Sequence, residues 1–303
     1  MKPGGRTGSA GWAVQNLHWA PRPAWGLAPA LALGIAAALA AAAAGCAGPR
    51  ARADAVARAA GFTREEVVAG AFVLTAFSRI HRPDAPLDVY IEGDGVAWRS
   101  RTQPSADPTP RRATALALAA ADPAPNVLYL ARPCQFTPRP HDPRCTAAYW
   151  TGRRFAPEVV AATDIALSRY AARVPGQGIH LVGFSGGGAL AVLVAARRGD
   201  IASLRTVAGD LDTEFVNRLH GVSPMPESLN PIEAAARIAG IAQVHFAGTA
   251  DSVVPPIVAE RFIAATGGGC AQLHMVAGLT HTGEWDRLWP ALLGLRPMCA
   301  DAP

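Results

Sequence analysis

Ser185 lies in the stretch Gly183-Phe184-Ser185-Gly186-Gly187, where small residues flank a serine at a spacing that suits nucleophilic chemistry. The stretch follows an apolar run at 179–182 and precedes a helix-like run at 189–197. A serine on such a strand-to-helix turn holds its hydroxyl exposed, and the first amide of the helix points at the group that the serine attacks. The pattern predicts acyl-transfer chemistry with Ser185 as the nucleophile.

A histidine must accept the serine proton, because a hydroxyl is a poor nucleophile at neutral pH. The chain has eight histidines, and several of them fall inside predicted strands or in Pro-rich loops. His281 instead follows the last predicted strand, 272–276, in a polar turn. We predict His281 as the catalytic base, with His220, in a middle insertion, as the alternative.

A carboxylate is then needed to orient the imidazole and to offset its charge when it is protonated. Asp251 follows the predicted strand 243–246 and fits this role best. Asp210 and Asp212, which follow the predicted strand 204–208, remain the alternatives.

Backbone amides stabilise the negative oxygen of a tetrahedral intermediate. Gly186, directly after the nucleophile, is one predicted donor. The second is expected after the predicted strand 87–91, in Glu92-Gly93-Asp94-Gly95, with Asp94 first and Gly95 next. Two carboxylates beside an oxyanion would oppose it unless they are turned away or paired, and the arginines available for pairing are Arg99, Arg101 and Arg132.

Predicted strands alternate with predicted helices along residues 70–296, which favours a mostly parallel, twisted sheet with helices on both faces. Ligands then lie beyond the carboxyl ends of the strands, where all the residues above fall. The serine motif, the order Ser, Asp, His and the G-x-x-D-x-x-V-P loop at 248–255 together resemble the α/β-hydrolase fold. The expected fold class is therefore α/β, with a small lid insertion.

This resemblance implies a serine hydrolase that cleaves a carboxylic ester or thioester through an acyl-enzyme, with a small-molecule substrate and with no metal or organic cofactor. Two alternatives stay open. One is a hydrolase-shaped lipoprotein that binds a ligand without turnover, and the other is an acyltransferase that uses the same triad. The segment 209–240 is long for a crossover and rich in proline, so we expect a lid-like insertion, with Phe184 and His220 lining the substrate site.

The first 45 residues carry Lys2, Arg6, Arg22 and an apolar, alanine-rich run that ends in Ala43-Ala44-Gly45-Cys46. This end resembles a bacterial lipobox with Ala in place of the usual Leu. It implies a signal peptide at 1–45, acylation of Cys46, and a periplasm-facing protein held at the outer membrane by its lipid. An uncleaved membrane anchor is the alternative. Residues 46–69 are then a tether and lead-in, and residues 70–303 form the hydrolase domain.

Removing the signal takes away three of the 28 basic residues and none of the 23 acidic ones, so the basic balance does not indicate nucleic-acid binding. Four cysteines remain after Cys46, and in an exported chain they predict two disulfides. Three pairings are possible. We favour Cys134 with Cys145 and Cys270 with Cys299; none of the four has metal-ligand spacing.

Overall fold

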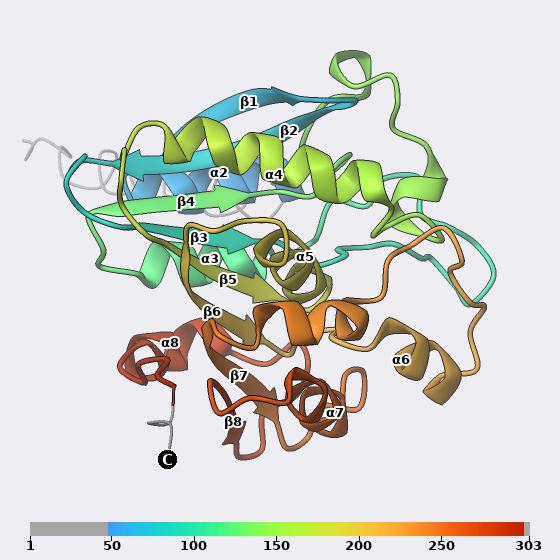
Figure 1. Cartoon of the computed structure of the whole chain (residues 1–303). Coiled ribbons are helices and arrows are strands. Elements are labelled where there is room, and N and C mark those ends of the chain that lie inside the picture. The colour runs from blue at the N-terminus through green and yellow to red at the C-terminus, as the bar shows by residue number, and fades with distance from the viewer. Residues whose placement is uncertain (1–47, 300–303) are drawn as a thin grey trace, which may run out of the picture. The chain divides into compact units, whose positions relative to one another are not determined.

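A computed structural model describes residues 48–299, which form an eight-stranded sheet with the strand order β1-β2-β4-β3-β5-β6-β7-β8 (Figure 1). The β1/β2 and β2/β4 pairs are antiparallel and all other neighbours are parallel. The strands are β1 (Thr63–Ala69), β2 (Phe72–Ile80), β3 (Leu87–Ile91), β4 (Asn126–Leu130), β5 (Ile179–Phe184), β6 (Ile201–Val207), β7 (Ala242–Gly248) and β8 (Ala271–Val276).

Helices cover both faces of this sheet. Two buried clusters divide the core: one packs α4, α5 and α7 on the front face, and the other packs α2, α3 and α8 on the opposite face (Figure 1). The helices are α2 (Pro49–Ala59), α3 (Thr114–Ala121), α4 (Pro157–Ala171), α5 (Gly186–Ala195), α6 (Thr213–Leu219), α7 (Ile257–Thr266) and α8 (Trp285–Leu293). Short 3₁₀ helices are η1 (Arg139–His141), η2 (Ala147–Trp150) and η3 (Pro231–Ile238).

The apolar runs of the sequence explain the central layer. Every residue of β4 is buried, as expected for a strand with helices on both faces, and its sequence is accordingly apolar apart from its first residue. All ten residues of α5 are buried as well, and this helix is accordingly apolar on every side. Its buried position holds the turn that precedes it at the edge of the sheet. The described residues contain no helix whose length and apolar character would let it cross a bilayer.

One expected boundary is wrong. Of residues 46–69, expected as a tether and lead-in, those from Pro49 onward form α2 and the edge strand β1, which pairs with β2 along its whole length. The sequence pattern typical of a strand is weak here because the first half of β1 is polar. Residues distant in the chain balance the charge of Glu65 in this strand, since Glu65 accepts a hydrogen bond from Tyr170 at 2.7 Å and pairs with Arg173 at 2.9 Å.

The insertion expected at 209–240 is only partly lid-like. Its last part, η3, buries Ala234, Ala235 and Ile238 in the same core cluster as α5 and α7. What extends past the sheet is α6 and the loop after it (Figure 1). The predicted signal peptide and the acylation site Cys46 lie outside the described residues.

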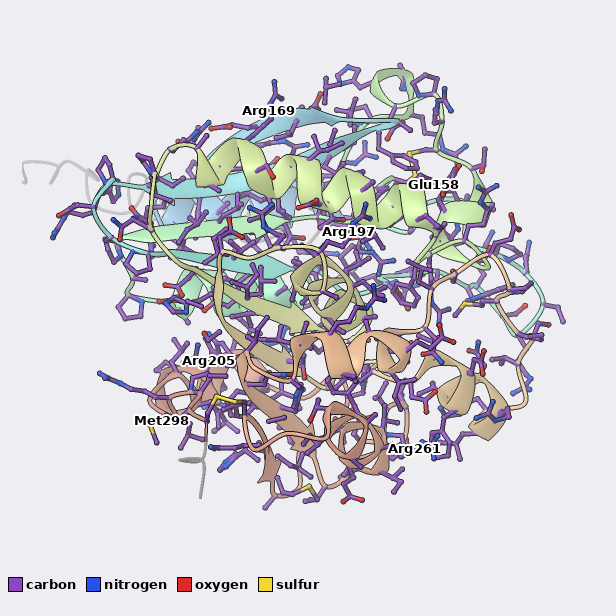
Figure 2. The ribbon with its side chains drawn as sticks, in the orientation of Figure 1. Glu158, Arg169, Arg197, Arg205, Arg261 and Met298 are labelled. Atoms are coloured by element: carbon purple, nitrogen blue, oxygen red, sulfur yellow. A yellow bond between two sulfur atoms is a disulfide. The ribbon has the colours of Figure 1, made fainter. Side chains whose placement is uncertain are left out.

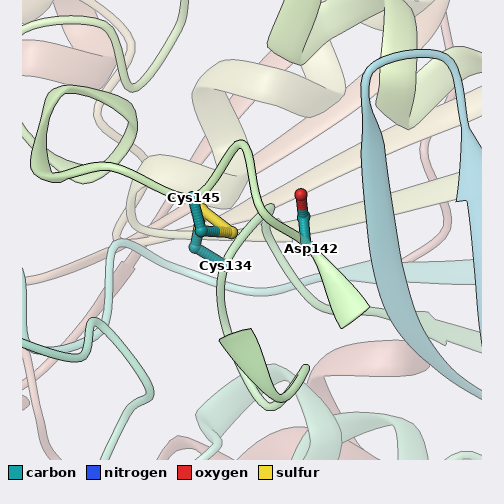
Figure 3. A group of neighbouring side chains, drawn as sticks. All are labelled: Cys134, Asp142 and Cys145. Atoms are coloured by element: carbon teal, nitrogen blue, oxygen red, sulfur yellow. A yellow bond between two sulfur atoms is a disulfide. The ribbon is translucent and has the colours of Figure 1, made fainter. Parts of the chain in front are cut away.

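Two disulfides join Cys134 to Cys145 and Cys270 to Cys299, the pairing favoured from the sequence. The first lies beside Asp142 (Figure 3), whose Oδ2 accepts a hydrogen bond from the Val73 amide at 3.1 Å. Metals bind cysteine as the thiolate, so the bonded sulfurs of this cluster do not act as ligands. The bridge instead closes the loop that follows β4.

Replacing both Cys134 and Cys145 by serine is expected to lower the free energy of unfolding by roughly 2–3 kcal/mol, because the unfolded chain regains the entropy of an open loop. The Cys270→Ser/Cys299→Ser variant is the matched comparison. Its loop spans 29 residues against 11, so its loss should be the larger by about 1 kcal/mol. Urea unfolding under non-reducing conditions measures both, and an unchanged midpoint for either variant would contradict the expectation.

Candidate active site

Ser185 sits on the turn between β5 and α5 with φ 53° and ψ −123°, a conformation that non-glycine residues rarely adopt. At positions 183 and 187 the neighbouring backbone lies too close for any residue larger than glycine. A Cβ at position 183 would lie 2.3 Å from the Gly187 carbonyl oxygen, and one at position 187 would lie 2.1 Å from that of Ile91. Glycine at 183 and 187 therefore lets the turn form, and Ser185 is left partly exposed among buried neighbours.

Three side chains from separate strand ends meet at this turn. His281 Nε2 lies 2.9 Å from Ser185 Oγ, and His281 Nδ1 lies 2.8 Å from Asp251 Oδ2. The other carboxylate oxygen of Asp251 accepts hydrogen bonds from the amides of Val253 and Val254, each at 2.8 Å. The Asp251 side chain is fully buried and that of His281 is 12% exposed. The backbone thus fixes the carboxylate, and the carboxylate orients the imidazole.

The alternatives for base and acid are engaged elsewhere. His220 Nε2 is 2.7 Å from the Val253 carbonyl oxygen, so it ties the end of α6 to the loop that carries Asp251. Asp212 caps α6 by accepting from the Phe215 amide at 3.1 Å, and it pairs with Arg261 at 2.9 Å. Within residues 48–299 neither His220 nor Asp212 forms a hydrogen bond with Ser185 or His281.

Phe184, expected to line the substrate site, is 8% exposed. Its ring centroid lies 5.5 Å from that of the His281 imidazole. The ring therefore packs beside the imidazole and forms part of its surroundings.

Glu92 points away from the nucleophile. Its Oε1 accepts hydrogen bonds from the Gly93 amide at 2.9 Å and the Ala115 amide at 3.3 Å, and its Oε2 accepts from the Tyr129 hydroxyl at 3.2 Å. The residue is 1% exposed, and burial raises the pKa of its carboxyl from 4.5 to about 7. Glu92 thus holds the start of the loop after β3 through these hydrogen bonds, and its raised pKa reduces the negative charge that it carries at neutral pH.

Asp94 points toward the nucleophile but is paired. Its carboxylate lies 2.6 Å from Arg132 Nη1 and 3.2 Å from Arg154 Nε. Burial alone would raise its pKa, yet Arg154 and Arg132 hold it below the usual value. Arg154 also pairs with Asp210 at 3.4 Å, where burial raises the pKa to about 6. Asp210, an alternative for the acid, is therefore part of this charge cluster, and its amide donates to the Ser185 carbonyl oxygen at 3.0 Å.

The expected oxyanion donors are only partly brought together. Gly186 is the first residue of α5, so its amide has no acceptor within the helix. A Cβ at Gly93 would lie 3.2 Å from Ser185 Cβ, which places the start of the β3 loop beside the nucleophile. Gly95 instead adopts φ 67° and packs against the 108–110 segment, where a Cβ would lie 2.0 Å from the Pro108 carbonyl oxygen. The geometry favours Asp94 over Gly95.

Arg154 is the main residue of this site that sequence reasoning missed. It follows η2 within an irregular segment, and no motif marks it. Of the arginines proposed to pair with the β3 loop, Arg132 does so, whereas Arg101 donates to the His220 carbonyl oxygen at 3.4 Å. Both Arg132 and Arg154 stack on the Phe155 ring, at 5.0 and 5.2 Å from its centroid. Only the folded chain brings the two guanidinium groups to one carboxylate.

Comparison with solved structures gives the fold. The chain is similar to the Pyrococcus furiosus esterase Pf2001, with 12% identity and a TM-score of 0.56 over 77% of this chain and 90% of that one. It is similar to a bacterial membrane phospholipase A, with 16% identity and a TM-score of 0.51 over 88% and 98%. Esterase Est1E from Butyrivibrio proteoclasticus is 15% identical, with a TM-score of 0.53 over 76% and 95%.

The fold is that of the α/β hydrolases. The expected fold class is confirmed, with two antiparallel pairs at one edge of the sheet. No family model matches the sequence, and no curated protein matches it. The structural likeness therefore establishes the fold, and the chemistry of the site depends on the side chains that this α/β-hydrolase fold carries.

Replacing Glu92 by glutamine should change how stability depends on pH. The folded-state pKa of about 7 lies above the ordinary 4.5, so the wild-type carboxyl loses stability as the pH rises through this interval. The loss amounts to about 3 kcal/mol at most. Glutamine has no charge to desolvate, so the difference in unfolding free energy between wild type and Glu92→Gln should shift in favour of the variant from pH 4.5 to 7. Urea unfolding across this range measures it, and a constant difference would contradict it.

Proposed function

We propose that this protein is a serine hydrolase that cleaves a carboxylic ester or thioester through an acyl-enzyme, with Ser185, His281 and Asp251 as its catalytic triad. The observation that carries the proposal is the continuous chain of contacts from Ser185 Oγ to His281 Nε2 at 2.9 Å and from His281 Nδ1 to Asp251 Oδ2 at 2.8 Å. The partly exposed Ser185 on its strand-to-helix turn and the α/β-hydrolase fold support the same assignment of the triad.

In this mechanism His281 Nε2 takes the proton of Ser185 as the hydroxyl oxygen attacks the substrate carbonyl carbon. The protonated imidazole then gives its proton to the leaving alcohol or thiol, and the acyl group stays on Ser185. Asp251 stabilises the imidazolium in both steps. A water molecule, deprotonated by His281, next attacks the acyl carbon, and the serine leaves with the returned proton.

The oxyanion is held by the amides of Gly186 and Asp94 in this proposal. Two such donors, preorganised in a partly buried site, each stabilise the transition state by a few kcal/mol. Arg132 and Arg154 offset the negative charge of the Asp94 carboxylate, so this charge opposes the oxyanion at the Asp94 amide less. The carboxylate next to Gly186 also favours the second candidate function, a hydrolase-shaped protein that binds a ligand without turnover. An acyltransferase would use the same steps with another acceptor in place of water.

We further propose a location in the bacterial envelope, with the chain lipid-anchored through Cys46 and facing the periplasm. The support is the apolar segment that ends in Ala44-Gly45-Cys46, together with the two disulfides, which persist in oxidising compartments.

Treatment with a fluorophosphonate reagent, which phosphonylates activated serines, tests the proposed enzyme. We expect labelling of the wild type at Ser185 and none in Ser185→Ala, because only an activated hydroxyl reacts. Hydrolysis of p-nitrophenyl esters of increasing acyl length should fall by about 10⁴-fold in the same variant. A correctly folded wild type that neither reacts nor hydrolyses any ester would support the non-catalytic binder instead.

Replacing Gly186 by alanine should reduce kcat by roughly tenfold or more with little change in KM, since the lost stabilisation acts on the transition state. A Cβ there would lie 2.2 Å from Asp94 Oδ1 and 2.9 Å from Arg132 Nη1, so it must displace this ion pair beside the oxyanion site. Gly199→Ala is the matched control, because a Cβ at that position meets nothing within 4 Å. Equal kinetics for the two variants would remove Asp94 from the oxyanion site.

A further inference from the structure

A second polar site lies on the face of the sheet covered by α3 and α8, at the amino ends of the strands. Asp88 on β3 is the register partner of His180 on β5, and His180 is the partner of Ser203 on β6. Arg205 lies two residues after Ser203 and so shares its face of the sheet. These four side chains form a polar row at the end of the sheet opposite the catalytic turn.

This row borders a cavity of about 550 Å³, a volume within the range of small-ligand sites. Asp122, at the end of α3, and Arg296, in the segment after α8, complete its polar lining. Figure 2 shows Arg205 close to the chain segment that carries Met298, which is tied to β8 by the disulfide between Cys270 and Cys299. One wall of the cavity is thus covalently fixed.

Arg205 is 8% exposed, and its charge is not matched by an ion pair anywhere in residues 48–299. Its only hydrogen bond there runs from Nη2 to the Leu295 carbonyl oxygen at 3.5 Å, and its buried Nε has no partner. A buried guanidinium with so few partners is costly. The buried Nε is out of a ligand's reach, but Nη1 forms no hydrogen bond within residues 48–299 and is available to an anionic group.

Asp88 is the complementary group. In the part of the chain that the structure describes, its carboxyl forms no hydrogen bond and no ion pair, and burial followed by the nearby Asp122 raises its pKa to about 7. The strand β5 separates β3 from β6, so the two strands lie about 10 Å apart. Asp88 and Arg205 attract each other over this distance, which partly offsets the rise in the pKa of Asp88, but they form no ion pair.

The other polar groups of the cavity do not replace these missing partners. His180 Nδ1 is 2.7 Å from Ser203 Oγ, and burial together with Arg205 lowers the pKa of its imidazole. Asp122 accepts from the Tyr90 hydroxyl at 2.5 Å and from the Ala124 amide at 2.8 Å. The cavity therefore presents a carboxyl and a guanidinium that attract each other at a distance, and within residues 48–299 neither has a direct partner of opposite charge.

We propose that this cavity binds a zwitterionic ligand of the free amino-acid class, with its carboxylate on Arg205 and its ammonium group on Asp88. One such molecule brings an opposite charge into direct contact with both groups at once, and Arg296 at the rim adds attraction for the carboxylate. A simple anion would face Asp88 and Asp122, and a simple cation would face the two arginines. The site is separate from Ser185 and does not depend on its chemistry.

Calorimetric titration of the purified full chain with each of the twenty standard amino acids tests the proposal. We expect saturable binding of at least one of them, and binding about tenfold or more weaker for its N-acetyl derivative, which lacks the ammonium, and for its amide, which lacks the carboxylate. Equal binding of the N-acetyl derivative or of inorganic phosphate would show an anion site and overturn the proposal, as would no saturable binding of any amino acid at millimolar concentration.

The variants Arg205→Gln and Asp88→Asn should each weaken binding of that amino acid by about tenfold or more. Arg218→Gln is the control, because the Arg218 side chain is 64% exposed on α6 and, among the described residues, pairs only with Glu214. Ser185→Ala should bind the amino acid as the wild type does, which separates this site from the proposed catalysis. Binding by a variant that ends at Cys299 but not by the full chain would mean that the chain's own terminus fills the cavity, and the proposal would be wrong.

Discussion

The close approach of the turn at Ser185 to the end of β3 is the constraint on which the site depends. Gly187 packs against the Ile91 carbonyl oxygen and Gly183 against Gly187 itself, at distances that exclude a Cβ. This contact places the first turn of α5 beside the β3 loop. The serine hydroxyl, the first amide of α5 and the start of the loop after β3 thereby lie together at the carboxyl edge of the sheet.

The two carboxyl groups near that point, Glu92 and Asp94, are stabilised in different ways. Glu92 is buried against backbone amides and the Tyr129 hydroxyl, where its raised pKa favours the neutral form. Asp94 stays charged because two arginines face it. The backbone is also strained there: among residues 48–299 the non-glycine residues with positive φ are Cys134, Phe136, Ser185 and Ala208, which follow β4, β5 and β6. Strain of this kind persists only where surrounding contacts enforce it.

Much of the fold could be predicted because local sequence and burial agree. The expected strand 87–91 coincides with β3, and the expected strand 243–246 lies within β7, since both are largely buried runs that end in a polar or glycine-containing turn. The first strand and η3 could not be predicted. Polar residues dominate the exposed half of β1, and the short apolar residues of η3 become core only because α5 and α7 lie against them.

The sequence by itself determined which residues stand at strand ends, because apolar runs, glycines and the serine motif are local signals. It thus indicated Ser185, Asp251 and His281 and favoured the two disulfides. Only the tertiary structure decided how charges are matched, since Arg154 reaches Asp94 and Asp210 across 60 and 56 positions of chain. It also decided that Arg205 and Asp88 remain apart, because pairing over such separations depends on strand order and register, which no local pattern encodes.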